Sequence, residues 1–230
     1  DLNPMQYLSP KFFYQYCTEK KKSKDKILVL DKDMVLLCEQ LQEDYKNQPE
    51  YIPSYAVELA ILTGMRVGEI AALTWDSISK DGILINKSEK YNRKTNTYFI
   101  DATKNKKERL FPMCNEISNL LDKVKKAELQ NGYICEWVFA NEDGRVHAPV
   151  ISSCIKNKCR QLGIEERGIH ALRKTFNSKI RNIGVAPTVA ATLLGHSVEV
   201  NQKYYTFDVT SNDEKKEIVS LINENLPLAK

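Results

Sequence analysis

The sequence predicts an α+β domain that is mostly α-helical and carries a small three-stranded antiparallel sheet. Apolar residues recur at intervals of three and four along most of the 230-residue chain, which is the spacing of amphipathic helices. The stretch 82–112 breaks this pattern with short apolar runs that are typical of strands. A chain of this length can bury one sizeable core. No apolar run reaches the length of about 20 residues that a membrane helix needs.

Three helices are predicted before the strands. The first should begin at Asp31 as an N-cap and bury one apolar face, made of Met34, Leu37, Cys38 and Leu41. The second should start at Pro53–Ser54 and end at Gly64. The third should begin at Arg66 and turn four apolar side chains inward, those of Val67, Ile70, Ala71 and Leu73. Arg66 could then reach a concave surface, or simply pair with Glu69 and hold the loop.

Three short strands are predicted from the apolar runs 83–85, 98–100 and 110–111. The turn between the last two, 103–108, contains three lysines, and Pro112 should end the sheet. A lysine at the tip of a turn is normally only solvated. A lysine that folds back over a phosphate would be the exception.

The second half of the chain is predicted to be helical. Amphipathic helices are expected around 117–124, over 150–162 and at the segment that contains His170. A short helix should follow over 189–194 and end at Gly195, which suits a left-handed C-terminal position. A last helix over 212–225, capped by Ser211, should carry an apolar face made of Ile218, Val219, Leu221 and Ile222.

Charge and cysteine content narrow the class of protein. The net charge is +4, and two lysine-rich stretches, 20–26 and 87–109, could follow a nucleic-acid backbone. The six cysteines form no C-x-x-C pair, so we expect mostly buried, reduced thiols and no metal site. Nothing at the start resembles a signal peptide, and we expect a cytoplasmic protein that does not contact a membrane.

Three segments are expected along the chain. Residues 1–28 are predicted to be a linker, because prolines, aromatic residues and lysines alternate there. Residues 29–207 should form the catalytic domain, and residues 208–230 a C-terminal tail with its own helix. The chain begins with Asp1 rather than an initiator Met, so we expect a piece of a longer protein.

The stretch 170–205 contains most of the side chains that could take part in a reaction. His170 and Arg173 are three residues apart and so share one helical face. His196 follows Gly195 at a predicted helix end, and Tyr204 and Tyr205 lie eight and nine residues further on. Imidazoles, a guanidinium and a phenol grouped in this way suit an anion attacked by an oxygen nucleophile. A helical domain with a satisfied histidine and two core tyrosines is the alternative from these residues alone.

Five motifs in order carry a family resemblance: TGMRVGEIAALTW, TKNKKERLFPM, HALRKTF, LGHS and YYTF. Together they resemble the catalytic domain of tyrosine recombinases, in the style of phage and conjugative-transposon integrases. The resemblance covers about residues 30–207. It implies the fold of that catalytic domain and the cutting and rejoining of DNA through a 3′-phosphotyrosyl intermediate, with no metal and no cofactor.

The resemblance also implies a role for each matching residue. The catalytic set would be Arg66, Lys104, His170, Arg173, His196 and Tyr205. Tyr205 would be the nucleophile, His170 its base and Lys104 the acid for the leaving 5′-oxygen. Glu69 would orient Arg66. DNA contacts are expected from Lys20, Lys21, Lys22, Lys106, Lys107 and Lys174, the last of which stands where many relatives carry His or Arg.

The expected partners are double-stranded DNA and other protomers of the same protein, arranged as a tetrameric synapse in a bacterial, nucleoid-associated setting. The tail could dock on a neighbouring protomer or on its own domain. Two other functions remain open at this stage. One is a catalytically inactive DNA-binding regulator, and the other is a relaxing enzyme similar to type IB topoisomerases.

Overall fold

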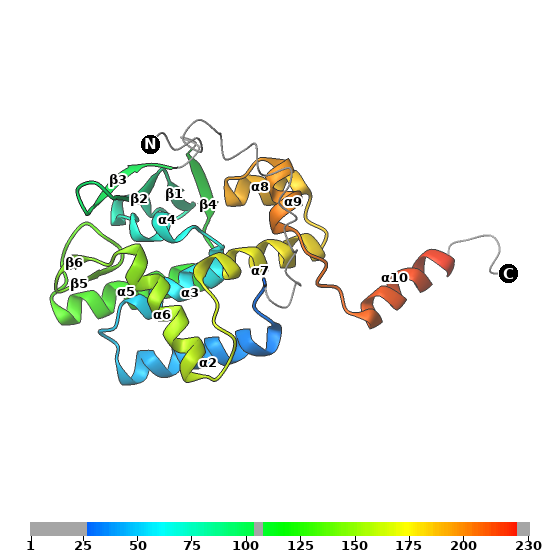
Figure 1. Ribbon diagram of the computed structural model, residues 1–230, viewed down its shortest axis with the longest axis horizontal. Helices are drawn as coiled ribbons and strands as arrows, with labels where there is room; N and C mark the ends of the chain where they lie inside the picture. Colours follow the sequence, from blue (N-terminus) through cyan, green and yellow to red (C-terminus); the bar gives the residue numbers. More distant parts are fainter. Residues whose placement is uncertain (1–26, 104–107, 225–230) are drawn as a thin grey trace, which may run out of the picture.

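The computed structural model describes residues 27–103 and 108–224, and Figure 1 shows their arrangement. The first part contains α2 (Asp31–Asn47), α3 (Pro53–Thr63), α4 (Val67–Ala71), the 3-10 turn η3 (Trp75–Ser77), β1 (Gly82–Ile85), β2 (Lys87–Asn92), β3 (Thr97–Ala102) and β4 (Arg109–Pro112). The second part contains α5 (Asn115–Asn131), β5 (Ala140–Asn141), β6 (Gly144–Arg145), α6 (Ala148–Gln161), α7 (Ile169–Asn182), α8 (Pro187–Leu194), α9 (Val198–Tyr205) and α10 (Asn212–Glu224).

Helix α3 is the centre of the core. It is apolar nearly all round and buried along most of its length, because α2, α5, α6 and α7 all pack against it. Leu37 and Leu41 of α2 are fully buried against this core, as the sequence predicts. Cys38 is exposed instead, and Asp31 lies inside the first turn rather than at the N-cap, which is Leu30.

The predicted third helix is much shorter than its apolar spacing indicates. Helix α4 ends at Ala71, and the chain then runs extended before η3. The backbone of this segment pairs with residues 136–138: Val138 N donates to Leu73 O over 3.0 Å, and Trp75 N donates to Glu136 O over 2.9 Å. Tertiary hydrogen bonds therefore replace the helical ones.

The strand region confirms the α+β class but corrects the predicted pairing. Four strands, not three, lie between residues 82 and 112, and they form two separate two-stranded antiparallel ladders, β1 with β4 and β2 with β3. Strand β2 (KSEKYN) was missed because it lacks an apolar alternation. Among the described strands β3 and β4 do not pair, so they are not the two arms of one hairpin.

The predicted helices of the second half are present as α5, α6, α7, α8 and α10, whereas α9, which ends at Tyr205, was not predicted. Gly64 and Gly195 end α3 and α8 with φ of 61° and 64°. Space as well as φ requires glycine there: a Cβ on Gly64 would lie 2.9 Å from the Phe176 ring, and one on Gly195 would lie 2.8 Å from the Arg109 guanidinium. Both glycines bring helix ends close to the residues discussed below.

Helix α10 stands away from the rest of the molecule in Figure 1. Its start is a capping box, as Ser211 Oγ accepts from Glu214 N and Ser211 N donates to the Glu214 carboxylate. Ile218 and Val219 are 52% and 57% exposed. In this structure the tail helix is therefore not a core element of its own domain.

Two other predictions concern the cysteines and membranes. Of the described cysteines only Cys154 and Cys159 are buried, whereas Cys38, Cys114 and Cys135 are exposed, so the prediction of mostly buried thiols is wrong. Cys17 lies outside the described residues. Within 27–103 and 108–224, no helix has both the length and the apolarity to cross a bilayer.

Candidate active site

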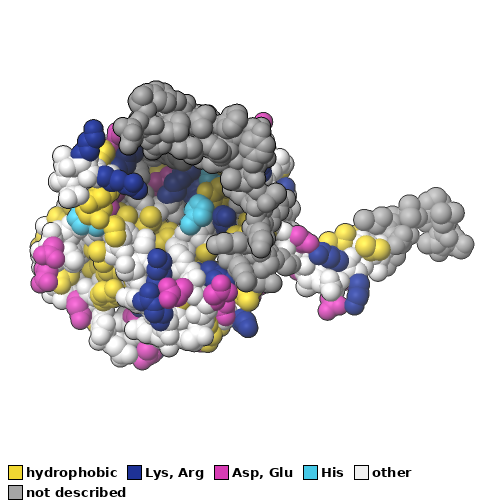
Figure 2. Space-filling view, viewed as in Figure 1, with side chains coloured by type: hydrophobic (Ala, Val, Ile, Leu, Met, Phe, Trp, Pro, Cys, Tyr) yellow, Lys and Arg dark blue, Asp and Glu magenta, His cyan; other side chains and the backbone are white. Residues whose placement is uncertain are grey.

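Four segments that are distant in sequence meet at one site. Helix α7 supplies His170 and Arg173, the end of α8 leads into His196, the end of α9 supplies Tyr205, and Arg66 lies between α3 and α4. Figure 2 shows cationic and histidine side chains gathered on the upper part of this face, between the strands and helices α8 and α9. The structure therefore brings together five of the six residues predicted to be catalytic.

Arg173 forms the floor of the site. Its side chain is only 1% exposed, and it donates from Nη1 to Gly64 O over 2.7 Å and from Nη2 to Leu194 O. These bonds tie the ends of α3 and α8 together. Burial, followed by the charge of Arg66, lowers the pKa of Arg173 to about 9, so the guanidinium still carries its charge at neutral pH. Its buried Nε has no hydrogen-bond partner among the described residues.

His196 is held by Arg173, with 2.7 Å between Nη2 and the imidazole Nε2. A guanidinium can only donate, so Nε2 must accept and the neutral ring carries its proton on Nδ1. Burial, followed by the charges of Arg173 and Arg66, lowers the pKa of His196 to about 3. The buried Nδ1 has no partner within the described parts of the chain. His196 thus presents a neutral, unused N–H donor to the site.

His170 lies at the start of α7 and also contacts Tyr205. Partial burial, followed by the charges of Lys174, Arg173 and Arg66, lowers the pKa of His170 to about 4. The imidazole is therefore neutral at pH 7 and able to accept a proton. Its ring meets that of Tyr205 edge-on, with 5.3 Å between the centroids.

Tyr205 and Tyr204 have different surroundings. The Tyr205 ring lies 4.0 Å from the His196 ring between centroids, and the Arg173 guanidinium lies 5.6 Å from the Tyr205 centroid. Tyr204 is 51% exposed, and Lys203 lies over its ring. Only Tyr205 therefore faces the cationic site.

Glu69 holds two guanidinium groups at the back of the site. It accepts from Arg66 Nη1 over 2.8 Å and from Arg109 Nη1 and Nη2 over 3.1 and 2.6 Å. Burial alone would raise the pKa of Glu69, but the hydrogen bonds and charge of Arg109 and the charge of Arg66 outweigh it and lower the pKa to about 2. The predicted contact between Arg66 and Glu69 is present, and Arg66 also donates to Gly195 O over 3.2 Å.

Arg109 is the residue of this site that the sequence analysis missed. Its Nε donates to Leu193 O over 3.0 Å, which joins β4 to the end of α8. Arg109 closes one of two lysine-rich stretches, where it looked like one more solvated cation. The available signal was the strand alternation, because Arg109 lies two residues before the buried Phe111 and therefore on the same face of β4.

An open cavity of about 430 Å³ lies beside this cluster. It is lined by Arg66, Arg109, Gly195 and His196, among others, and Thr103 places the end of the described β3 segment at its rim. Three arginines, Arg66, Arg109 and Arg173, outnumber the two nearby carboxylates, Glu69 at the back of the site and Glu108 in the cavity lining. A cavity with excess positive charge and N–H donors beside it can hold an anion.

Lys174 lies closer to Tyr205 than expected. Its Nζ is 5.9 Å from the centroid of the Tyr205 ring and 5.6 Å from that of Phe207. Of the other predicted residues, Lys104, Lys106 and Lys107 in one turn, and Lys20, Lys21 and Lys22 near the start, lie outside the described residues.

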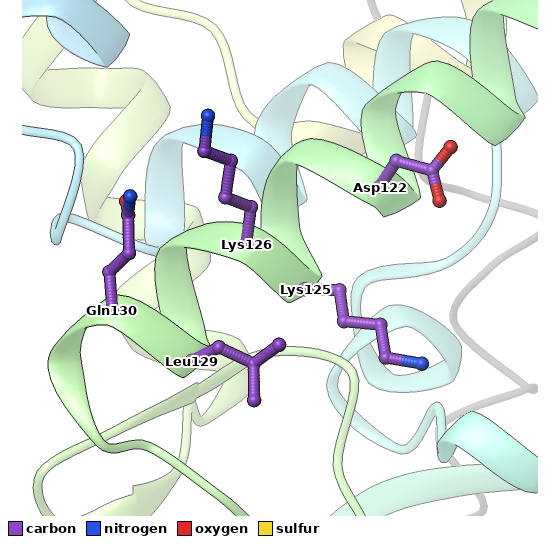
Figure 3. A pocket seen from close by; sticks show the side chains of 5 residues that line it. All are labelled: Asp122, Lys125, Lys126, Leu129 and Gln130. Carbon is purple, nitrogen blue, oxygen red and sulfur yellow. The ribbon is translucent and has the colours of Figure 1, made fainter.

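A second depression on the surface lacks such convergence. One is formed by Asp122, Lys125, Lys126, Leu129 and Gln130, and Figure 3 shows that all five side chains come from helix α5 alone. All five are exposed on the helix surface. No cluster of three or more His, Cys, Asp or Glu side chains suited to a metal occurs in the described part of the chain.

The sequence of residues 28–210 matches the model of the phage integrase family. The chain belongs to this family. Among curated relatives of this integrase domain, the transposase of transposon Tn916 from Enterococcus faecalis is 28% identical, over 82% of this chain and 53% of the relative. A XerC-like tyrosine recombinase from Caldanaerobacter subterraneus is 29% identical, over 72% of this chain and 48% of the relative. The chain thus spans about half the length of the curated relatives it matches.

Solved structures of integrases and recombinases share the fold. The integrase of transposon Tn1549, in complex with transposon right-end DNA, superposes with a TM-score of 0.72 at 17% identity, covering 92% of this chain and 70% of that one. The XerA recombinase gives a TM-score of 0.61 at 20% identity, covering 85% of this chain and 65% of that one. The resemblance to tyrosine recombinase catalytic domains is therefore confirmed, together with the mostly helical α+β fold.

Proposed function

We propose that this integrase domain cuts and rejoins DNA at specific sites, as the strand-transfer domain of a mobile-element recombinase in the bacterial cytoplasm. The observation that carries the proposal is the position of Tyr205, whose ring contacts the rings of both His170 and His196 and lies 5.6 Å from the Arg173 guanidinium. A phenol held against a cationic, donor-rich cavity suits attack on a phosphodiester. The substrate class is therefore double-stranded DNA.

The proposed reaction is a transesterification. The Tyr205 hydroxyl oxygen forms a bond to the scissile phosphorus, the bond from phosphorus to the 5′-oxygen breaks, and a 3′-phosphotyrosyl link remains. The phenol proton passes to a base, and the leaving 5′-oxygen takes up a proton. Because the phosphotyrosyl ester conserves the energy of the phosphodiester, the reverse attack by a 5′-hydroxyl rejoins the strand.

The cations of the site would stabilise the transition state. Negative charge builds up on the non-bridging oxygens as the phosphorus becomes five-coordinate, and fixed donors in a partly buried site stabilise it strongly. Arg66, which lines the cavity, and the buried Arg173, which contacts His196 of that lining, supply positive charge there. The free Nδ1–H of His196 is suited to donate to one of these oxygens. Glu69 and Arg109 would position Arg66 rather than touch DNA.

His170 is the base that the geometry favours. Tyrosine has an ordinary pKa near 10, so at neutral pH its attack is aided by proton removal. His196 cannot accept that proton, because its Nε2 already accepts from Arg173. His170 is neutral, and its ring contacts the Tyr205 ring edge-on. Lys104, carried by the turn beyond Thr103, is proposed as the acid for the 5′-oxygen.

The lysines outside the described residues are proposed to contact DNA phosphates. Lys20, Lys21, Lys22, Lys106 and Lys107 would add binding energy that falls with rising salt, and Lys174 would act beside Tyr205. We also propose that residues 1–28 link this domain to further DNA-binding parts. The exposed face of α10 would dock on a neighbouring protomer, so that several protomers assemble on DNA as a tetrameric synapse.

The test is covalent capture of DNA. Duplexes from the flanks of the encoding mobile element, nicked close to the candidate cleavage positions, would trap the enzyme because the short 5′-hydroxyl fragment diffuses away. We expect a covalent protein–DNA band on a denaturing gel for the wild type and for Tyr204→Phe. Tyr205→Phe should bind the same DNA but give no band.

Other outcomes would point to other functions. DNA binding without a band for any duplex would indicate an inactive regulator. Relaxation of supercoiled plasmid without sequence preference would indicate an enzyme of the topoisomerase type. A band that depends on Tyr204 and not on Tyr205 would overturn the assignment of the nucleophile.

A further inference from the structure

One face of α7 carries a polar stripe that extends beyond the residues of the phosphate site. His170, Arg173, Lys174, Asn177 and Ser178 follow the spacing i, i+3, i+4, i+7 and i+8, which places them on a single face of the helix. The first three side chains lie against the Tyr205 ring. The last two do not reach the ring and contact its backbone instead.

Asn177 and Ser178 hold the carbonyl group of Tyr205. Asn177 Nδ2 donates to Tyr205 O over 2.8 Å, and Ser178 Oγ donates to the same oxygen over 3.2 Å. Tyr205 is the last residue of α9, so its carbonyl has no partner within the helix. Two side chains of α7 thus satisfy the group that ends the helix of the nucleophile.

Further bonds extend this arrangement to both sides of Tyr205. Asn201 Nδ2, one turn earlier on α9, donates to Asn177 Oδ1 over 2.7 Å. Asn177 Nδ2 also donates to Thr206 Oγ1 over 3.2 Å, and Phe207 N donates to Ser178 Oγ over 3.1 Å. The segment before and after the nucleophile is therefore tied to α7 at several points.

This network is buried and closed. The side chains of Asn177, Ser178 and Asn201 are fully buried, and the amide of Asn177 uses both its donor hydrogens and its acceptor oxygen. Thr206 Oγ1 completes the ring by donating back to Asn201 O over 3.2 Å. A buried polar group without a partner is costly, so removal of one member destabilises the arrangement of the others.

We propose that Asn177 and Ser178 are positioning residues that fix Tyr205 for in-line attack. The inference rests on the proposed role of Tyr205 as the nucleophile. The two residues share helix α7 with Arg173, which forms the floor of the phosphate site. One rigid helix therefore sets the distance between the nucleophile and the phosphate. Neither residue touches DNA or the reacting atoms.

The main test separates positioning of the nucleophile from activation of the phosphate. Asn177→Ala should slow covalent adduct formation at saturating DNA by about 10- to 100-fold, because a misplacement of about 1 Å has effects of that size. Its DNA affinity should stay within about twofold of the wild type, since its contacts are all internal. Ser178→Ala, which removes one of the two bonds to Tyr205 O, should have a smaller effect in the same direction.

A second arm replaces the nucleophile. In Tyr205→Phe protein, added hydrogen peroxide is a small oxygen nucleophile that can attack the same phosphorus and release the same 5′-hydroxyl. Asn177→Ala should leave that peroxide-dependent cleavage unchanged, because arginines and histidines still activate the phosphate. A parallel loss of peroxide cleavage would overturn the proposal, and so would an unchanged rate of adduct formation in Asn177→Ala.

A third arm needs no activity. Chymotrypsin should cut at Tyr205 or Phe207 severalfold faster in Asn177→Ala, because the end of α9 opens more often once its ties are lost. Asn182→Ala is the matched control: Asn182 lies on the same helix and accepts from Thr210, but it does not contact Tyr205.

If the wild type forms no adduct, the proposed function fails. Unchanged proteolysis in Asn177→Ala would refute the positioning network by itself. Should Asn177→Ala fail to fold, as seen by circular dichroism, Asn177→Asp and Ser178→Ala carry the same comparisons.

Discussion

Glu69 and Arg109 form a two-point ion pair that is almost completely buried, with 2.6 and 3.1 Å between their carboxylate oxygens and guanidinium nitrogens. The pair joins α4 to β4, and the remaining donor of Arg109 reaches the end of α8 through Leu193 O. Arg66 shares the same carboxylate. The orientation of Arg66 therefore depends on Arg109, a second arginine that binds the same carboxylate from strand β4.

Removal of Arg109 should destabilise the fold strongly. In Arg109→Ala, Glu69 would keep a buried charge with only Arg66 beside it, and breaking a buried pair in this way typically costs about 3–5 kcal/mol. We expect that loss in the free energy of unfolding from urea denaturation. The double variant Arg109→Met with Glu69→Gln should recover part of it, because no unpaired buried carboxylate and no large cavity remain, and Arg66, which loses its ion pair, is partly exposed to water.

The exposed pair of Arg160 and Glu166 is the matched control for this prediction. Arg160→Ala should leave the unfolding curve unchanged, since ion pairs at the surface are screened by water and salt. Equal effects of Arg109→Ala and Arg160→Ala would show that the Glu69 pair does not hold the three elements together.

The sequence predicts the helices around α3 and the positions of five catalytic candidates because those features leave local signals. Periodic apolar residues mark each helix, and Gly64 and Gly195 mark helix ends. Strand β2 left no such signal, since its residues are polar and its partner lies beyond a turn. Arg109 and Asn177 were missed for a related reason. Their roles depend on partners 40 and 28 residues away, which spacing along the chain does not reveal.

Lys104 should act on the leaving group rather than on phosphate binding. The 5′-oxygen leaves as a strongly basic alkoxide and needs a proton, whereas a bridging sulfur at that position leaves as a stable thiolate. Lys104→Ala should therefore be slow on normal DNA and close to the wild-type rate on a 5′-bridging phosphorothiolate duplex, measured as covalent adduct formed in a single turnover. Equal defects on both duplexes would instead assign Lys104 to phosphate binding, or the acid role to Lys106 or Lys107.

Protonation of His196 should make the fold less stable in mild acid. The pKa of His196 is about 3 in the folded protein, against an ordinary value of 6.5, so the unfolded chain binds this proton more readily. Stability should fall as the pH drops below about 6.5, by at most about 1.4 kcal/mol per pH unit for this group. His170 acts in the same direction, with a folded pKa of about 4.

Comparison of variants isolates the contribution of His196. Burial raises the pKa of Glu128 to about 7, which has the opposite sign and adds stability as the pH falls towards 4.5. Glu69, with a pKa of about 2, loses its contribution only below about 4.5. Thermal unfolding between pH 7 and pH 5 should therefore shift less in His196→Asn than in the wild type. Identical shifts in the two proteins would contradict a buried, neutral His196.

Deletion of residues 211–230 should abolish assembly of several protomers on DNA without unfolding the domain. Helix α10 stands away from the domain, so the truncated chain should keep its free energy of unfolding to within about 0.5 kcal/mol. On DNA, however, the truncated chain should lose the complexes that contain several protomers, because the apolar side chains of Ile218 and Val219 no longer reach a neighbour. The rate of adduct formation should also change, since helix α10 begins seven residues after the proposed nucleophile.

Point variants on α10 test the same prediction without shortening the chain. Ile218→Glu and Val219→Glu place a charge on the exposed apolar face and should prevent assembly on DNA, measured by gel shift and sedimentation. Ser220→Glu adds the same charge beside that face and should assemble normally. Assembly on DNA should therefore depend on the apolar face of α10 rather than on the tail's charge or length. Unfolding of the truncated chain, or assembly as complete as that of the intact chain, would mean that α10 belongs to its own domain and does not connect protomers.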